Sequence, residues 1–211
     1  MDREYRIPSS LGEILDPTSS ALVVWDMQVG MAGRAFNLST VEANTHRLIS
    51  TADDAEVAVI WSRHSGLPHE YTSNVRLADL MERQGVNSPG ELRRHMEPDT
   101  DDWQWLPGFR PSRGHLVLDK STPSFFIGTP FELALRSRGV TSLVLAGVAT
   151  ERGIEMTARH AMALGFFVVI AEDGVGSFTH EGHDLGLQYL RSAMPVVTTD
   201  EIVRSWSATG E

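Results

Sequence analysis

The chain has 211 residues, of which 41% are hydrophobic and 22% are charged, a balance typical of one soluble globular domain. Its 28 acidic residues outnumber its 18 basic residues, and the formal charge of −10 argues against a nucleic-acid-binding surface, which needs a positive field. The chain contains no cysteine, which excludes disulfides, thiolate metal sites and a cysteine nucleophile.

The N-terminal segment 1–17 is polar and carries four acidic residues. A secretory signal peptide needs a basic start followed by an apolar run, so we expect no such signal here. No apolar run approaches the roughly 20 residues of a membrane helix, so we expect a cytoplasmic protein that does not contact a membrane. We assign residues 1–211 to a single domain, with residues 1–20 as an N-terminal extension.

Short apolar runs rich in β-branched residues recur along the chain and predict strands. In chain order they cover residues 21–25, 57–61, 115–118, 143–146, 166–171 and 195–197. The runs are continuous rather than alternating, which is typical of strands covered on both faces.

Helical patterns lie between these runs, at residues 40–53, 129–139, 154–164 and 181–194. Thr40 is a possible start of the first helix, and Thr129 is a cap that precedes a proline at the first helical position. Gly139 and Gly165 suit the ends of the second and third helices. The alternation of strands and helices predicts a three-layer α/β/α sandwich with a mainly parallel sheet.

Residues 63–114 differ from the rest of the chain because they hold five prolines, several large aromatic residues and an acidic cluster at 99–102. Short helices over 75–83 and 89–95 fit inside this segment. Long excursions of this kind in α/β domains act as lids or subunit contacts, and an elaborated surface loop is the alternative. The sequence leaves both interpretations open.

Polar residues follow the predicted strands where the strands end, which in an open parallel sheet is the ligand-binding edge. They include Asp26 and Gln28, the run 62–64, Asp119 and Lys120, the turn 147–153, and Glu172 and Asp173. Asp26 follows a run that should be buried, and a buried carboxylate needs a charged or hydrogen-bonding partner. Lys120 is the natural partner, either in a catalytic pair in which Asp26 transfers a proton or in a structural ion pair.

Three segments resemble the isochorismatase-like, or cysteine hydrolase, superfamily. They are Val-Val-Trp-Asp26-Met-Gln28, Lys120-Ser-Thr-Pro-Ser-Phe-Phe-Ile-Gly-Thr129 and Leu-Ala-Gly-Val-Ala-Thr150-Glu-Arg-Gly153-Ile-Glu-Met-Thr-Ala-Arg159, and Ala171-Glu-Asp173-Gly follows. The resemblance covers residues 21–177 and implies a three-layer α/β/α fold. Most members have an Asp–Lys–Cys triad. Asp26 and Lys120 match its first two positions, and Gly153 stands at the position of the cysteine.

A glycine at position 153 cannot form the thioester through which amide hydrolysis in this superfamily proceeds. The resemblance points instead to isochorismatases, several of which carry glycine there and cleave a vinyl ether to release pyruvate. That reaction needs a proton donor for the enol-ether carbon, followed by water. In this scheme Asp26 is the general acid, Lys120 orients it and is available to a substrate carboxylate, and Gly153 leaves room for the substrate.

The resemblance also implies residues that contact substrate without reacting. His64 falls near a substrate-binding glutamine of isochorismatases, with a surface histidine as the alternative. Phe125 and Phe126 match a segment that helps to form the pocket wall, with core packing as the alternative. The predicted substrate-binding set is completed by Gln28, Val148, Ala149 and Thr150, and the superfamily often has a cis peptide at the position of Val148–Ala149.

Arginine binds carboxylates through two parallel hydrogen bonds, which makes the arginines near the strand ends candidates for an anionic substrate. Arg63, Arg76 and Arg152 are such candidates, and their positions in the sequence favour Arg63 and Arg152.

Nicotinamidases of the superfamily bind a divalent metal through an Asp-x-His…His cluster after the second strand. The matching run 62–69 keeps His64 and His69 but has Ser62 in place of the acid, next to Arg63. Two neutral ligands make a poor metal site, so we expect neither a metal nor another cofactor.

The leading interpretation is a hydrolase without a cysteine nucleophile that acts on isochorismate or a related small anionic enol-pyruvyl ether. One alternative is a divergent member that serves as a small-molecule binding or assembly protein. Another is amide hydrolysis by water activated at Asp26, with no covalent intermediate. The resemblance further implies a homodimer or homotetramer.

Overall fold

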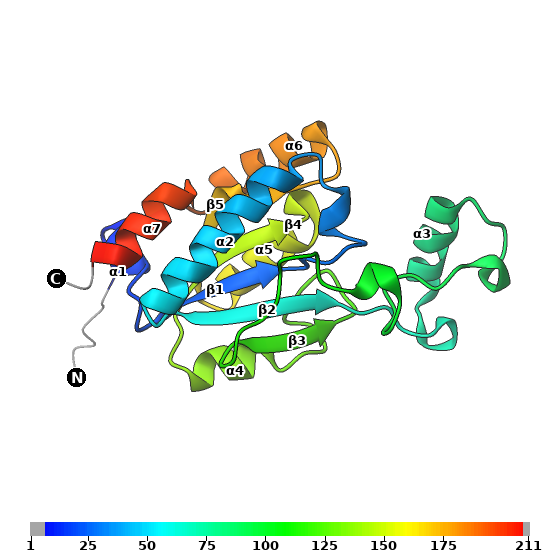
Figure 1. Cartoon of the computed structure of the whole chain (residues 1–211), viewed down its shortest axis with the longest axis horizontal. Coiled ribbons are helices and arrows are strands. Elements are labelled where there is room, and N and C mark those ends of the chain that lie inside the picture. Colours follow the sequence, from blue (N-terminus) through cyan, green and yellow to red (C-terminus); the bar gives the residue numbers. More distant parts are fainter. Residues whose placement is uncertain (1–6, 209–211) are drawn as a thin grey trace.

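A computed structural model describes residues 7–208 and shows a six-stranded sheet between two layers of helices (Figure 1). The strand order is β3-β2-β1-β4-β5-β6, and every neighbouring pair is parallel. The strands are β1 (Ser20–Trp25), β2 (Ala58–His64), β3 (Leu116–Lys120), β4 (Ser142–Val148), β5 (Phe167–Gly176) and β6 (Val196–Val197). The predicted fold class is confirmed. Residues 1–6 of the predicted N-terminal extension lie outside the described residues.

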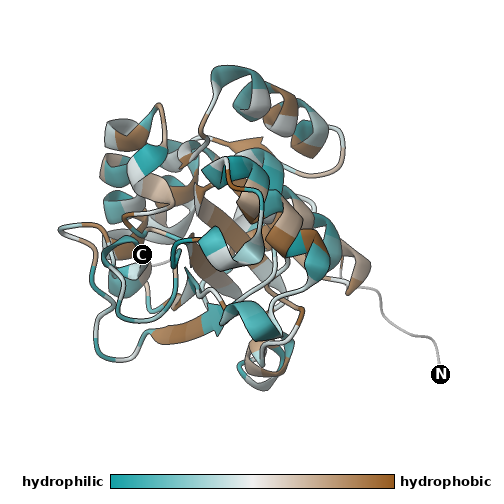
Figure 2. Ribbon diagram, turned by 90° about the vertical axis from the view of Figure 1, so that its right-hand side faces the viewer, coloured by the Kyte–Doolittle hydropathy of each residue, from teal (hydrophilic) through white to brown (hydrophobic). Residues whose placement is uncertain are grey.

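Two apolar cores, one on each face of the sheet, hold the layers together, because successive side chains of a strand point to opposite faces. Leu22 and Val24 of β1 pack with α2 (Leu38–Asp54) and α7 (Thr199–Ser207). Ala21 and Val23 pack on the other face with α4 (Phe131–Ser137), α5 (Glu155–Ala163) and α6 (His180–Arg191). Figure 2 shows the hydrophobic strands enclosed by helices whose outer faces are hydrophilic.

Several element boundaries differ from those predicted. Helix α2 begins at Leu38 rather than Thr40, with Asn37 as its N-cap residue. Strand β5 continues to Gly176, so Glu172 and Asp173 lie inside a strand and not at its end. Two helices were not predicted: α1 (Leu11–Ile14), which packs against α7, and α7 itself. None of the helices within 7–208 is long and apolar enough to cross a bilayer.

The segment 63–114 contains the predicted helix over 75–83 as α3 (Asn74–Gln84), but the predicted helix over 89–95 is wrong. Only the short 3-10 turn Pro89–Glu91 forms there, because the Gln84 amide takes both backbone groups of Arg93 in hydrogen bonds of 2.9 and 3.3 Å. Helix α3 has no buried residue and projects from the end of the molecule at which β2 and β3 finish (Figure 1).

Candidate active site

The sheet brings Asp26 and Lys120 together although 94 residues separate them in sequence. Asp26 follows β1 and Lys120 ends β3, with β2 lying between the two strands. The Lys120 Nζ lies 2.7 Å from the Asp26 Oδ2, and the side chains are 2% and 1% exposed, respectively. The predicted partnership is therefore present as a buried ion pair.

The Asp26 carboxylate is held on both oxygens. The Ser62 hydroxyl donates to Oδ1 at 2.6 Å, and Lys120 donates to Oδ2. Burial is the largest influence on this group and raises the pKa of Asp26 above its ordinary value, although Lys120 and Ser62 both favour the charged form. A carboxyl group with a raised pKa is suited to donating a proton.

The space beside Gly153 is filled rather than open. A Cβ atom at position 153 would lie 2.6 Å from Cζ2 and 2.8 Å from both Cε2 and Nε1 of Trp25. The same indole is buried, and its ring centre is 4.4 Å from the Lys120 Nζ. The expectation that Gly153 leaves room for a substrate is therefore not met in this conformation, because the Trp25 ring takes that room.

The turn after β4 forms as the resemblance implied. The Val148–Ala149 peptide is cis, which confirms that expectation, and residues 150–154 follow as a single π-helical turn before α5. Thr150 donates to the Gly176 carbonyl at 2.9 Å and lies 2.9 Å from the His183 Nδ1. Val148, Ala149 and Thr150 are all buried, and the Thr150 hydroxyl ties the turn to β5 and α6.

Gln28 acts as a clamp between the strand ends and the segment 63–114. Its amide nitrogen donates to the carbonyls of His64 at 3.0 Å and Trp103 at 2.7 Å, and its oxygen accepts from the His64 backbone at 2.7 Å. Both amide hydrogens are thus used within the protein. Gln28 is also fully buried, so the structure gives it a positioning role and no direct route to a ligand.

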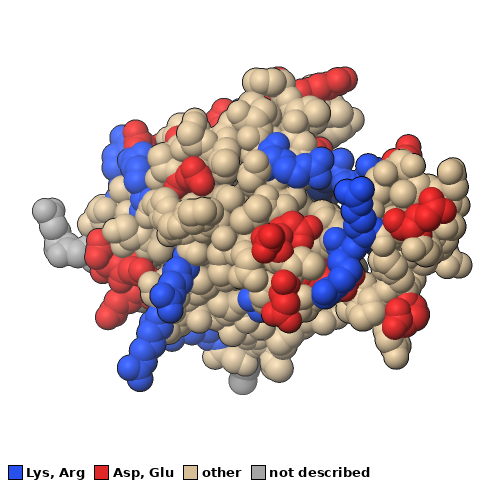
Figure 3. All heavy atoms as spheres, turned by 45° about the vertical axis from the view of Figure 1, so that its right-hand side comes forward, with Lys and Arg blue, Asp and Glu red and all other residues tan. Residues whose placement is uncertain are grey.

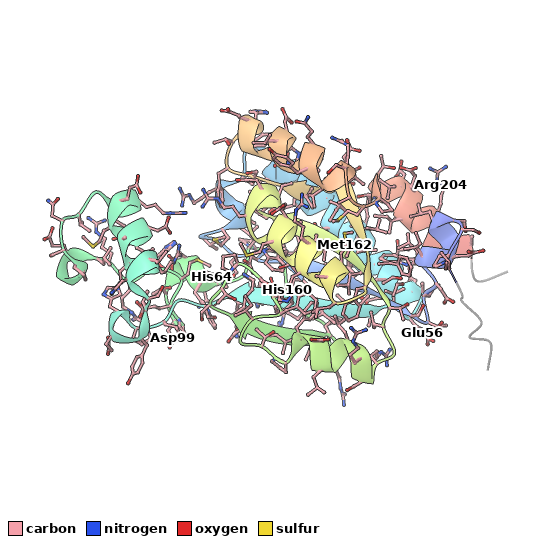
Figure 4. The ribbon with its side chains drawn as sticks, turned by 180° about the vertical axis from the view of Figure 1, so that it is seen from behind. Glu56, His64, Asp99, His160, Met162 and Arg204 are labelled. Carbon is pink, nitrogen blue, oxygen red and sulfur yellow. The ribbon has the colours of Figure 1, made fainter. Side chains whose placement is uncertain are left out.

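A cavity of about 220 Å³ lies between the carboxyl ends of β2 and β3 and the inner side of α3. It is lined by His64, Gly66, Leu67, His69, Tyr71, Thr72, Ser73, Arg76, Leu80, Arg93, His95, Glu97, Ser121 and Thr122. Burial and the charges of Lys120, Arg76 and His95 hold the pKa of His64 well below its ordinary value, which keeps this imidazole neutral. Figure 4 shows His64 between the sheet and the projecting helix.

The cavity receives different arginines from the two that the sequence favoured. Arg76 and Arg93 line it, and Arg76 also pairs with Asp79 at 2.5 Å. Arg63 does not line it, and instead pairs with Asp119 at 2.6 Å and stacks over the Trp103 ring at 3.8 Å. Arg152 is exposed, lies 3.6 Å from Glu151, and its guanidinium is 5.3 Å from the Phe178 ring. In Figure 3, basic side chains lie along the gap between the main body of the protein and the projecting part that contains α3.

Phe125 and Phe126 belong to the packing of the α4–α5 layer. Phe125 is fully buried, stacks on Phe131 at 4.2 Å and meets the Trp25 ring edge-on at 5.5 Å. Phe126 packs against the rings of Phe131 and His160 at 4.9 and 5.0 Å. Neither lines the cavity beside His64, so the core-packing alternative describes their position.

The two histidines considered for a metal, His64 and His69, both line the cavity. Within residues 7–208, however, no three histidine, aspartate or glutamate side chains come close enough together to hold an ion. His95, the third histidine of the cavity wall, is instead 2.7 Å from Asp102.

Two residues that shape the site were not predicted from the sequence. The sequence marks Ser62 as a strand-end polar residue and as the replacement for a metal-binding acid. Its register partner in the sheet is Trp25, which places its hydroxyl next to Asp26. In the sequence, Trp25 is simply the last residue of a predicted strand. The signal for both was available in the alternation of side chains at the ends of β1 and β2.

Comparison with known proteins identifies relatives over nearly the whole domain. A family model described as the isochorismatase domain matches residues 20–201. An isochorismatase-like hydrolase from Alkaliphilus metalliredigens has a TM-score of 0.76 at 22% identity, with coverage of 89% of this chain and 99% of that one.

Two further solved structures are similar. A cysteine hydrolase from Pseudomonas syringae pv. phaseolicola has a TM-score of 0.79 at 20% identity over 92% of this chain and 94% of that one. A nicotinamidase/pyrazinamidase from Bacillus subtilis has a TM-score of 0.70 at 22% identity over 85% and 99%. At these identities the structural matches establish the shared fold.

Proposed function

This chain belongs to the isochorismatase family, and from that premise we propose that it is a hydrolase that cleaves an enol-pyruvyl ether without a covalent enzyme intermediate. Isochorismate or a related small anionic ether is the proposed substrate. The observation that carries the proposal is the buried Asp26 carboxyl, which pairs with Lys120 and whose pKa is raised by burial. The Trp25 indole that Lys120 contacts packs against Gly153, a glycine at the position where acyl transfer would need a nucleophile.

The proposed reaction needs one proton and one water. Asp26 protonates the terminal methylene carbon of the enol ether, and the electron pair of the double bond forms the new C–H bond. The ether carbon becomes an oxocarbenium ion, which water attacks. The resulting hemiketal loses the alcohol to give pyruvate, and the proton released by the water restores the Asp26 carboxyl group.

We assign recognition of an anionic substrate to the cavity at the ends of β2 and β3. Arg76 supplies a guanidinium for a carboxylate, and neutral His64 can donate one hydrogen bond and accept another. His64 and Ser121 line the cavity on the same strand ends that carry Ser62 and Lys120. Since Asp26 is only 1% exposed, proton transfer requires the side chains between it and the cavity to move.

The test is pyruvate release from isochorismate by the parent protein, Asp26→Asn and Asp119→Asn. Asp119 is the matched control because it is a carboxylate at the end of β3 that pairs with Arg63 on the surface. General acid catalysis contributes about 10²- to 10⁴-fold, so Asp26→Asn should lower kcat by that factor while Asp119→Asn stays near the parent. Equal rates for all three folded proteins would refute the role of Asp26.

A second candidate is a protein that binds a small anion without turnover. The observation in its favour is that Trp25 covers the Asp26–Lys120 pair, while the 220 Å³ cavity is lined by other residues. This candidate would be favoured if calorimetry shows binding of isochorismate, no pyruvate is released from it, and no ammonia is released from amide substrates. Ammonia release lost in Asp26→Asn would instead support amide hydrolysis by activated water.

A further inference from the structure

The Trp25 indole fills the space that a side chain at position 153 would need. The nearest approaches of a Cβ atom at position 153 to the indole, 2.6 to 2.8 Å, lie below what real Cβ atoms tolerate. Trp25 is 1% exposed and meets Phe125 edge-on, so its ring cannot yield without disturbing the core. The backbone at Gly153 is helical and does not itself demand glycine, which leaves the indole as the reason for it.

The same ring faces the ion pair. The Lys120 ammonium lies 4.4 Å from the ring centre, within the range at which a cation is attracted to the face of an indole. Lys120 is therefore held by Asp26 on one side and by the Trp25 ring on another. The ring also keeps water away from the side of the Lys120 ammonium that it covers, which strengthens the attraction between Lys120 and Asp26.

We propose that Trp25 is a positioning residue, matched in size to Gly153, that takes the space of a side chain at 153 and keeps the Asp26–Lys120 pair dry and fixed. One consequence is that a nucleophile cannot be placed at 153 by a single substitution. The steric part of this proposal is independent of the proposed function, whereas its effect on proton transfer by Asp26 rests on that function.

The steric part is tested by a double-mutant cycle of Gly153→Ala and Trp25→Leu, followed by urea unfolding. A glycine-to-alanine change in a helical turn normally raises stability. Gly153→Ala should instead lower the unfolding midpoint in the parent, and the same change should not lower it in the Trp25→Leu background. Gly12→Ala is the control, because Gly12 lies in α1 with no atom within 4 Å of an added Cβ. Trp25→Phe provides a second background should Trp25→Leu fail to fold.

Equal lowering of the midpoint by Gly153→Ala in the parent and in a folded Trp25 variant would overturn the proposed size match. An unchanged midpoint in the parent would overturn it as well. The outcome does not depend on catalysis, so this test can fail or succeed whether or not the protein turns over an enol ether.

The electrostatic part is tested by following the Asp26 carboxyl carbon by NMR as the pH is changed. Lys120 on β3 is the charged group that acts on Asp26, and His64 on β2 contributes a backbone hydrogen bond. The charges that act on the His64 ring are those of Lys120, Arg76 and His95. In Trp25→Phe, water that reaches the ion pair relieves the burial of Asp26 and weakens the attraction of Lys120, two effects of opposite sign on the pKa of Asp26. Because burial is the larger influence, the Asp26 titration midpoint should shift downward, toward the ordinary carboxyl range. Trp103→Phe is the control, because Trp103 contacts Arg63 and Ser65 instead of the ion pair.

An Asp26 midpoint that is unchanged in folded Trp25→Phe would overturn the drying role of the indole. In an active parent enzyme, the acid limb of the kcat–pH profile should move in the same direction as the NMR midpoint. A shifted NMR midpoint without detectable turnover in the parent would uphold the positioning role while refuting the proposed hydrolysis.

Discussion

Replacing Lys120 by methionine removes the only cation bonded to Asp26 among the described residues and keeps a side chain of similar length. At 2.7 Å and an effective dielectric constant of about 20, Coulomb's law gives about 6 kcal/mol between unit charges, which is an upper limit. Breaking a buried pair by removing one partner costs about 3–5 kcal/mol in practice. We therefore expect Lys120→Met to lower the free energy of unfolding by about 3–5 kcal/mol near pH 8.

The loss should shrink as the pH is lowered. Burial raises the pKa of Asp26, and removing the charge of Lys120 raises it further. A carboxyl group whose pKa is raised in the folded state binds more protons there than in the unfolded chain. Its contribution to stability is therefore present at acid pH and is lost as the pH rises through the raised pKa. Lys120→Met should thus be closer to the parent near pH 5 than near pH 8.

Urea unfolding at both pH values, with linear extrapolation to water, measures this difference. Arg63→Met is the control because its partner Asp119 is 47% exposed, and ion pairs with an exposed member contribute about 0–1 kcal/mol. The double variant Asp26→Asn/Lys120→Met should be more stable than Lys120→Met near pH 8, because it lacks the unpaired charge. The reasoning fails if Lys120→Met loses the same amount at both pH values, or no more than Arg63→Met.

Four further outcomes follow from single contacts. Gln28→Ala should lower the free energy of unfolding by about 2–3 kcal/mol, at about 1 kcal/mol for each of three hydrogen bonds. It should also speed hydrogen exchange of the His64 backbone amide, and slow exchange there would refute the positioning role of Gln28. Arg76→Ala should raise the Kd of an anionic ligand at least about tenfold in calorimetry, whereas Arg63→Ala should leave the Kd unchanged. A larger effect of Arg63→Ala than of Arg76→Ala would place the ligand outside this cavity. Partial burial raises the pKa of Asp102, but hydrogen bonds from Thr100, Met96 and His95 outweigh burial and hold this pKa below its ordinary value. The resulting stabilisation is present above the ordinary pKa and is lost as the pH falls through the lowered pKa. Asp102→Asn should therefore flatten the fall of Tm in acid, as measured by thermal unfolding at several pH values. Thr198→Ala should lower the free energy of unfolding by about 1 kcal/mol in urea titrations, because it removes the capping box of α7; no change would mean that the cap is redundant.

The sheet could be predicted from the sequence because its signal is local. Each buried strand is a short continuous run of apolar residues, and the helices between them have caps or terminal glycines within a few residues. The helix predicted over 89–95 was wrong for a reason outside its own sequence, since the Gln84 side chain holds the backbone of Arg93. Helix α7 was missed although Thr198 and Glu201 form a capping box that can be recognised from residue types alone.

The candidate site was predictable where it depends on which strand ends meet, and less so where it depends on side-chain direction. Asp26 and Lys120 are placed together by the topology of the sheet alone. Arg63 was favoured by its position in the sequence, but Ser62 and His64 point toward the site while Arg63, between them, points to Trp103. A strict count of strand alternation would have separated these residues.

The size match between Trp25 and Gly153 could not be predicted, because it depends on the rotamer of a buried side chain. It nevertheless changes what the missing cysteine means. If the nucleophile alone had been lost, the turn after β4 would border an empty volume, and empty volume in a core is destabilising. The structure instead fills that volume with the indole and uses its face to hold Lys120. The glycine and the tryptophan are therefore one feature of this chain, and any chemistry assigned to Asp26 has to begin from a carboxyl group that an aromatic wall keeps from water.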